Sequence, residues 1–155
     1  MGIRIEAVEQ GECFAKRRTD GILIHMSKYW KGAHTKHKVM YHIVWIPKYR
    51  KRVLQGVIAD RIKELIIECA DVNRWRVDEI NVQPDHVHIL VQLRPDVSIS
   101  KSVQLIKGKS SRIIRKEFPE LEEFYWGDSF WCEGFFVETV GHLNIEMIQE
   151  YIKNQ

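Results

Sequence analysis

The sequence has few cysteines, and their spacing excludes the sites that cysteines usually build. Cys13, Cys69 and Cys132 are odd in number, lie far apart and form no Cys-x-x-Cys pair. This arrangement encodes neither a disulfide framework nor a structural zinc site. A reducing compartment fits this cysteine content best, so we expect a cytoplasmic protein.

Long apolar runs and a strong excess of one charge are also missing. No run approaches the roughly 18–20 residues of a membrane span, and the N-terminus lacks the apolar segment of a signal peptide. We therefore expect no membrane partner. The net charge of +3 is too small to indicate nucleic acid by itself, so the placement of the charges has to carry that argument.

The apolar content is sufficient for one folded domain. Of the 155 residues, 45% are hydrophobic, and a chain of this size can bury a core without metal or disulfides. Residues 1–25 show little periodicity and are interrupted by glycines, so we interpret them as an N-terminal extension. The domain is then expected to occupy residues 26–155.

Two histidines stand one residue apart in the apolar run of residues 80–93, INVQPDHVHILVQL. Strand side chains alternate between faces, so His86 and His88 project from one side of a strand while Val87 and Ile89 point to the other. Two imidazoles in fixed directions suit a divalent ion with open positions for substrate oxygens. The alternative is a pair of hydrogen-bonded histidines on a half-buried sheet face. Asp85 is placed to orient one of the rings.

The hydrophobic periodicity predicts four strands and three helices. Strands are expected over residues 39–46, 75–83, 86–93 and 130–140. Helices are expected over residues 57–72, from a cap at Asp96 or Ser98 to about residue 118, and from a cap at Asn144 to Gln155. Residues 119–128 read as a loop.

The order strand-helix-strand-strand-helix-strand-helix is that of a ferredoxin-like split βαβ sandwich with an added C-terminal helix. This α+β plan places the first and third strands at the centre of an antiparallel sheet. Helices cover one face, and we expect the other face to be free for a ligand. The same plan hosts RNA-binding modules and enzymes, so it does not decide the function.

Cations gather in two places. The first is the corner after Pro47, and the second is the helix predicted from Asp96, which has six cations and no acid before Glu117. A one-sign helix face favours nucleic-acid binding, although a solvated turn and a solvated face are the alternatives. The candidate DNA-binding residues are Lys48, Arg50, Lys51, Arg52, Lys101, Lys109, Arg112, Arg115 and Lys116.

The last predicted helix carries Tyr151 and Gln155 four residues apart. Side chains at this spacing share a helix face and can point at one site together. The alternative for Tyr151 is an ordinary amphipathic residue at a packing edge.

Five segments together resemble the single-tyrosine HUH transposases of the insertion sequence 200/605 family. They are YHIVWIPKYRKRVL, PDHVHILV, IKGKSSRIIRKEFP, FWCEGFFVETVG and YIKNQ, and the match spans residues 26–155. The resemblance implies that His86, His88 and Gln155 hold Mg²⁺ or Mn²⁺ and that Tyr151 is the nucleophile. Relatives often have a tyrosine in the fourth segment, where this chain has Phe135 and Phe136, so no competing hydroxyl exists there.

The resemblance also implies partners and an activity. Relatives cut and rejoin single-stranded DNA with hairpins near the ends of an insertion element, through a 5′-phosphotyrosine intermediate. They form homodimers that exchange the terminal helix, so that Tyr151 of one chain would act with the histidines of the other. Three alternatives stay open: a non-catalytic single-strand-binding module, a metal-dependent phosphohydrolase that uses water, and a domesticated relative that processes genomic repeats.

Overall fold

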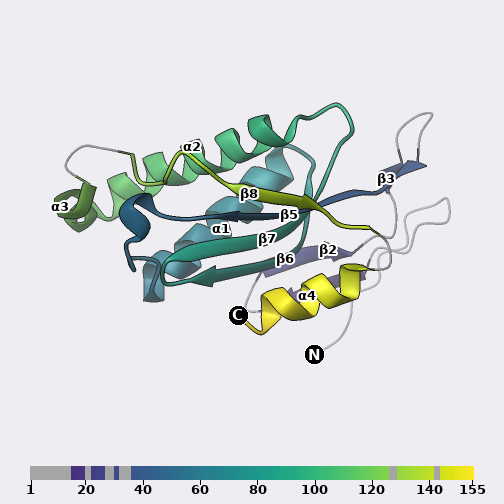
Figure 1. Ribbon diagram of the computed structural model, residues 1–155, viewed down its shortest axis with the longest axis horizontal. Coiled ribbons are helices and arrows are strands. Elements are labelled where there is room, and N and C mark those ends of the chain that lie inside the picture. Colours follow the sequence, from purple (N-terminus) through teal and green to yellow (C-terminus); the bar gives the residue numbers. More distant parts are fainter. Residues whose placement is uncertain (1–14, 20–21, 27–29, 32–35, 126–128, 142–143) are drawn as a thin grey trace.

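The computed structural model describes residues 15–19, 22–26, 30–31, 36–125, 129–141 and 144–155. Its centre is a four-stranded antiparallel sheet in the order β6-β7-β5-β8 (Figure 1). The strands are β5 (Val39–Trp45), β6 (Arg76–Gln83), β7 (His86–Leu93) and β8 (Phe136–Thr139). The first and third strands of the predicted plan, β5 and β7, are central, which confirms the split βαβ topology.

Alternation along the central strands separates two faces of the sheet. Ile43 on β5 and Val87 and Ile89 on β7 belong to the main hydrophobic core. Met40 and Leu90, which point the other way, belong to a second and smaller apolar cluster. The apolar-polar pattern of β5 and β7 therefore builds a core on one face and leaves histidines on the other.

Helices α1 (Gly56–Val72) and α2 (Ile99–Glu117) cover the core face, as predicted. The Ser98 side chain accepts a hydrogen bond from the Lys101 backbone N–H at 3.2 Å, so Ser98 rather than Asp96 caps α2. Ile62, Leu65 and Ile66 of α1 are buried. Figure 1 shows α2 and α4 (Ile145–Lys153) on opposite sides of the strands.

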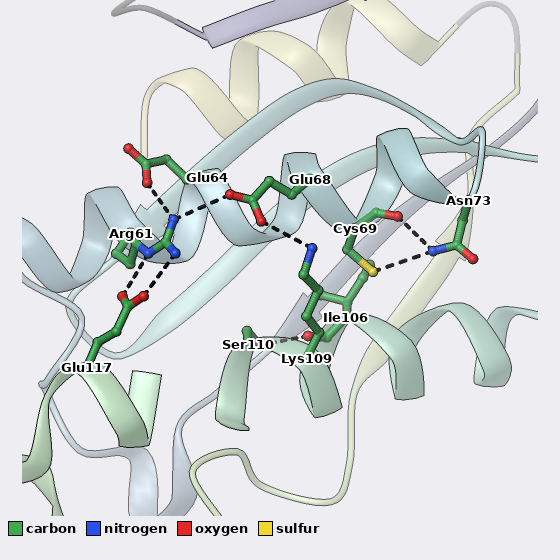
Figure 2. A network of polar contacts seen from close by, with 9 residues as sticks. All are labelled: Arg61, Glu64, Glu68, Cys69, Asn73, Ile106, Lys109, Ser110 and Glu117. Atoms are coloured by element: carbon green, nitrogen blue, oxygen red, sulfur yellow. Dashed lines mark hydrogen bonds and ion pairs between the residues drawn. The ribbon is translucent and has the colours of Figure 1, made fainter. Parts of the chain in front are cut away.

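A network of charges joins α1 to α2 (Figure 2). The Arg61 guanidinium donates to both carboxylate oxygens of Glu117, at 2.8 and 3.0 Å, and to Glu64 at 2.9 Å. The Lys109 ammonium donates to Glu68 at 3.2 Å. The hydrogen bonds from Arg61 hold the pKa of Glu117 below its ordinary value. One cation of the predicted basic face thus takes part in helix packing.

The final strand and the final helix are shorter than predicted. The strand predicted over residues 130–140 is wrong in its bounds, because β8 covers Phe136–Thr139 and Trp131 forms an isolated bridge with Pro47. The Lys107 ammonium donates to the Cys132, Glu133 and Gly134 carbonyls and keeps the backbone irregular up to β8. Helix α4 ends at Lys153, so the expectation that it runs to Gln155 is also wrong. The Asn144 side chain makes no cap hydrogen bond.

Short helical turns occupy the corner after Pro47 and part of the loop predicted over residues 119–128. They are the 3₁₀ turns η1 (Lys48–Arg50) and η2 (Pro119–Leu121), and the single-turn helix α3 (Glu122–Tyr125). Glu122 and Glu123 lie in the first turn of α3, where carboxylates are favoured by the helix dipole.

Helix α4 occupies part of the sheet face that was expected to be free. Its buried Ile152 packs on Met40 and Leu90, and the Asn81 side chain donates to the Ile152 carbonyl at 2.6 Å. Lys153 forms an ion pair with Glu79 at 3.5 Å. The expectation of an open face is therefore wrong over β6 and β7, because the apolar line of the helix packs there.

Two small hairpins precede the sheet. Strands β1 (Ala15–Thr19) and β2 (Ile22–Met26) pair in antiparallel fashion, as do β3 (Trp30–Lys31) and β4 (Lys36–His37). β2 lies against β6. The division into an extension over residues 1–25 and a domain over residues 26–155 stays a prediction. Among the described helices, none has the length and apolar character of a membrane span.

Candidate active site

The histidine pair of β7 lies on the α4 face of the sheet. The His86 and His88 rings are 4.8 Å apart between centroids and nearly perpendicular, at 77°. Val87 between them is fully buried in the opposite core. This confirms that both imidazoles project from one side of the strand, as the spacing predicted.

His86 is held by the turn that precedes it. Its Nδ1 lies 2.6 Å from Asp85 Oδ1, and the other oxygen of Asp85 accepts from the Arg50 Nε at 3.0 Å. The hydrogen bond from His86, with that from Arg50, lowers the pKa of Asp85 below its ordinary value. A carboxylate that accepts from Nδ1 leaves Nε2 with its lone pair.

His88 is held from the neighbouring strands. Its Nδ1 lies 3.0 Å from His42 Nε2 on β5, and His42 Nδ1 lies 2.8 Å from Glu138 Oε1 on β8. His42 was missed by the sequence analysis, although its alternation with Ile43 places it on the α4 face. Its contact with His88 depends on the pairing of β5 with β7, which only the sheet order reveals.

Burial keeps His88 neutral. The loss of solvent, with smaller contributions from the neighbouring His86 and His42, lowers the pKa of His88 to about 4. A neutral imidazole is the form that binds a metal ion. The surroundings of His88 therefore suit a metal ligand rather than a charged surface histidine.

Tyr151 of α4 lies over the same histidines. Its ring centroid is 5.9 Å from that of His88 and 6.2 Å from that of His42, edge to face in both cases. The side chain is 49% exposed, so the phenol is accessible to a large substrate. Within a single chain the structure thus brings together Tyr151, His86 and His88.

Gln155 is the third ligand that the sequence predicted, and this role stays a prediction. The residue is exposed and lies beyond the end of α4. In the part of the chain that the structure describes, no group of three His, Cys, Asp or Glu side chains forms a metal-binding cluster. The histidine pair fits an ion because the hydrogen bonds of both rings use Nδ1, which leaves the two Nε2 atoms for the ion.

The two basic regions lie at different distances from the histidines. Arg50 is 67% exposed and is linked to His86 through Asp85, so the corner of Lys48, Arg50, Lys51 and Arg52 borders the site. Tyr49 and Arg50 both have positive φ, of 59° and 50°. This backbone conformation is unfavourable for such residues.

The α2 cations lie on the far side of the sheet. Lys109 pairs with Glu68, and Arg115 pairs with Glu122 at 3.0 Å. Lys101 donates to Gln104 at 3.3 Å. Arg112 and Lys116 are exposed. A DNA strand bound at the histidines would contact these residues only if it extended around the protein to the other face of the sheet.

A split βαβ sheet with a His-hydrophobic-His pair on a central strand, and a tyrosine from a helix on the same face, defines the single-tyrosine HUH class. Residues 35–155 match the family model described as "Transposase IS200 like". The chain is 35% identical over 125 residues to the ISDra2 transposase TnpA of Deinococcus radiodurans, covering 81% of this chain and 89% of that protein. It is 36% identical over 123 residues to the transposase for insertion sequence element IS200 of Salmonella typhimurium, covering 79% and 80%.

Two solved structures of transposases have the same fold as this chain. A crystal structure assigned as a transposase from Deinococcus radiodurans R1 has a TM-score of 0.68 at 35% identity and covers 81% of this chain and 97% of that one. A REP-associated tyrosine transposase bound to a REP hairpin has the same fold, with a TM-score of 0.57 at 16% identity over 82% and 70% of the two chains. The chain belongs to the IS200-like transposase family, which is a family of DNA-processing enzymes.

Proposed function

We propose that this protein cuts and rejoins single-stranded DNA at the ends of an insertion element through a covalent bond to Tyr151. The observation that carries the proposal is the position of the Tyr151 ring, 5.9 Å from His88 and accessible to solvent. A nucleophile and two imidazoles on one sheet face suit phosphoryl transfer.

Each step follows from the chemistry of the side chains. The Tyr151 oxygen loses its proton and attacks phosphorus, the bond from phosphorus to the 3′ oxygen breaks, and the 3′ oxygen takes up a proton. A phenol with a pKa near 10 is a far better leaving group than an alkoxide. A 3′-hydroxyl can therefore attack the phosphotyrosine later and release Tyr151, so rejoining needs no ATP.

His86 and His88 would hold Mg²⁺ or Mn²⁺ through their Nε2 atoms, and Gln155 is the third ligand that the family resemblance implies. The ion would neutralise the charge of the phosphate oxygens. Arg50 and its neighbours border the histidines and would contact the phosphates of the bound strand.

The proposal is tested with labelled single strands from the ends of the element, with and without hairpins, and with the matching duplexes. We expect cleavage of hairpin-bearing single strands in Mg²⁺ or Mn²⁺, and no cleavage in EDTA or with His88→Ala. Gln155→Ala is the comparison that asks whether the terminal amide is a ligand. Full activity in EDTA would end the metal hypothesis, and equal cleavage of duplexes would end the single-strand hypothesis.

A further inference from the structure

His42 is a buried histidine in the middle of the candidate site, and the steps of the proposed reaction do not use it. It is 4% exposed, and both ring nitrogens have protein partners: Nε2 faces His88 Nδ1 at 3.0 Å, and Nδ1 faces Glu138 Oε1 at 2.8 Å. The His42 and His88 rings are nearly parallel, at 11°. Three side chains from three adjacent strands thus form one hydrogen-bonded chain.

The direction of these hydrogen bonds is set by Glu138, which lies at one end of the series. A carboxylate only accepts, so His42 Nδ1 must donate to Glu138. The Nε2 of a neutral His42 then carries a lone pair and accepts from His88 Nδ1. A neutral His88 has one N–H, and because that proton is on Nδ1, its Nε2 is left with a lone pair.

The opposite tautomer would place a proton on His88 Nε2 and prevent that nitrogen from binding an ion. The tautomer of His86 is fixed in the same way by a different acceptor, since Asp85 accepts from its Nδ1. Partners on the second nitrogen of a ligating histidine fix its tautomer and its ring direction.

We infer that His42 and Glu138 are positioning residues that fix the Nδ1–H tautomer of His88 and so make its Nε2 a ligand for a divalent cation. The inference rests on the proposed function, because that function supplies the reason for a cation here. The tautomer itself is a property of the protein without metal or DNA, and it can be measured separately.

The first measurement is of the His88 tautomer, by ¹⁵N NMR of the imidazole nitrogens in the full chain without metal. We expect the Nδ1–H form in the wild-type protein and a mixture of tautomers in Glu138→Ala. Phe136→Leu is the matched control, because Phe136 lies on the same strand and face and touches the His42 ring edge to face at 6.3 Å, but it accepts no proton.

The second measurement is of Mn²⁺ affinity, by electron paramagnetic resonance of the free ion. We expect Glu138→Ala and His42→Phe to weaken binding by roughly 10–100-fold, the range for partners of metal ligands. His42→Gln should recover part of the affinity, since its amide oxygen can accept from His88. Phe136→Leu should bind Mn²⁺ as the wild-type protein does. Thermal unfolding of each variant shows whether it is folded.

The outcomes separate the inference from the proposed function. A wild-type His88 protonated on Nε2, or a tautomer unchanged by Glu138→Ala and His42→Phe, would overturn the inference. So would a loss of Mn²⁺ affinity as large in Phe136→Leu as in Glu138→Ala. A third outcome is that the wild-type protein has the expected tautomer, that Glu138→Ala loses it, and that the wild-type protein binds no Mn²⁺. This outcome would confirm that Glu138 and His42 fix the tautomer of His88, and it would contradict the proposed metal site.

Discussion

At the scale of single residues, the polar groups of the sheet are held in charge states that their surroundings set. Asp78 is an example outside the active site. It lies at the irregular register between Val77 and Glu79 on β6, and burial raises its pKa from 3.8 to about 6. Glu79 contributes to this rise, whereas Lys38 and Arg76 oppose it.

This shift has a definite sign for stability. The folded protein binds the Asp78 proton more tightly than the unfolded chain, so protonated Asp78 stabilises the fold below about pH 4, and this contribution is lost as the pH rises through about 6. We predict that Asp78→Asn raises the free energy of unfolding at pH 8 by about 1–2 kcal/mol.

Urea unfolding of both proteins at pH 4, 6 and 8 checks this prediction. The difference between Asp78→Asn and the wild-type protein should grow from pH 4 to pH 8. A difference that is constant with pH would show that the carboxyl is not destabilised by burial in the fold.

At the scale of elements, the sequence predicts what depends on local periodicity. The apolar stripes of α1 and α2 and the alternation of β5, β6 and β7 come from 3.6- and 2-residue patterns, and the predicted bounds lie within one or two residues of the observed ones. The spacing of His86 and His88 predicted their common face for the same reason.

The sequence does not predict what depends on contacts between distant segments. Trp131 leaves the strand pattern because its Nε1 donates to Ser110 on α2 at 2.8 Å. His42 meets His88 through strand pairing, and α4 packs on the sheet because Ile152 has an apolar site on β5 and β7. None of these partners is near in the sequence, so no local pattern contains them.

The basic face of α2 gives a prediction for DNA binding. Neutralising Arg112 and Arg115 should weaken binding to all single strands, and the salt slope should fall by roughly 0.7 for each phosphate that the variant no longer neutralises. The measurement is the dissociation constant as a function of salt concentration. Lys63→Gln is the control, since Lys63 lies on α1 in an ion pair with Asp60 at 3.9 Å. An unchanged salt slope would show that this face does not contact the phosphates of the DNA.

At the scale of the whole molecule, the position of α4 decides how the active site is assembled. In one chain Tyr151 lies beside its own His88, whereas the family resemblance implies exchange of this helix within a homodimer. We predict exchange, with each site made from the histidines of one chain and Tyr151 of the other.

Mixed dimers distinguish the two assemblies. A His86→Ala/His88→Ala chain refolded with a Tyr151→Phe chain should recover a substantial fraction of cleavage, because a mixed dimer with exchanged helices has one site with no defect. If each chain uses its own Tyr151, every site carries a defect. Activity no higher than that of the separate mutants would then contradict exchange.

The most direct test of the central claim is to trap the covalent intermediate and identify the residue that carries it. Wild-type protein is incubated with a labelled single strand and a divalent ion, separated under denaturing conditions and digested for mass spectrometry. We predict DNA attached to the peptide that contains Tyr151, and no adduct with Tyr151→Phe, which should still bind the hairpin. An adduct that persists in Tyr151→Phe, or one that maps to Tyr41 or Tyr49, would contradict the account.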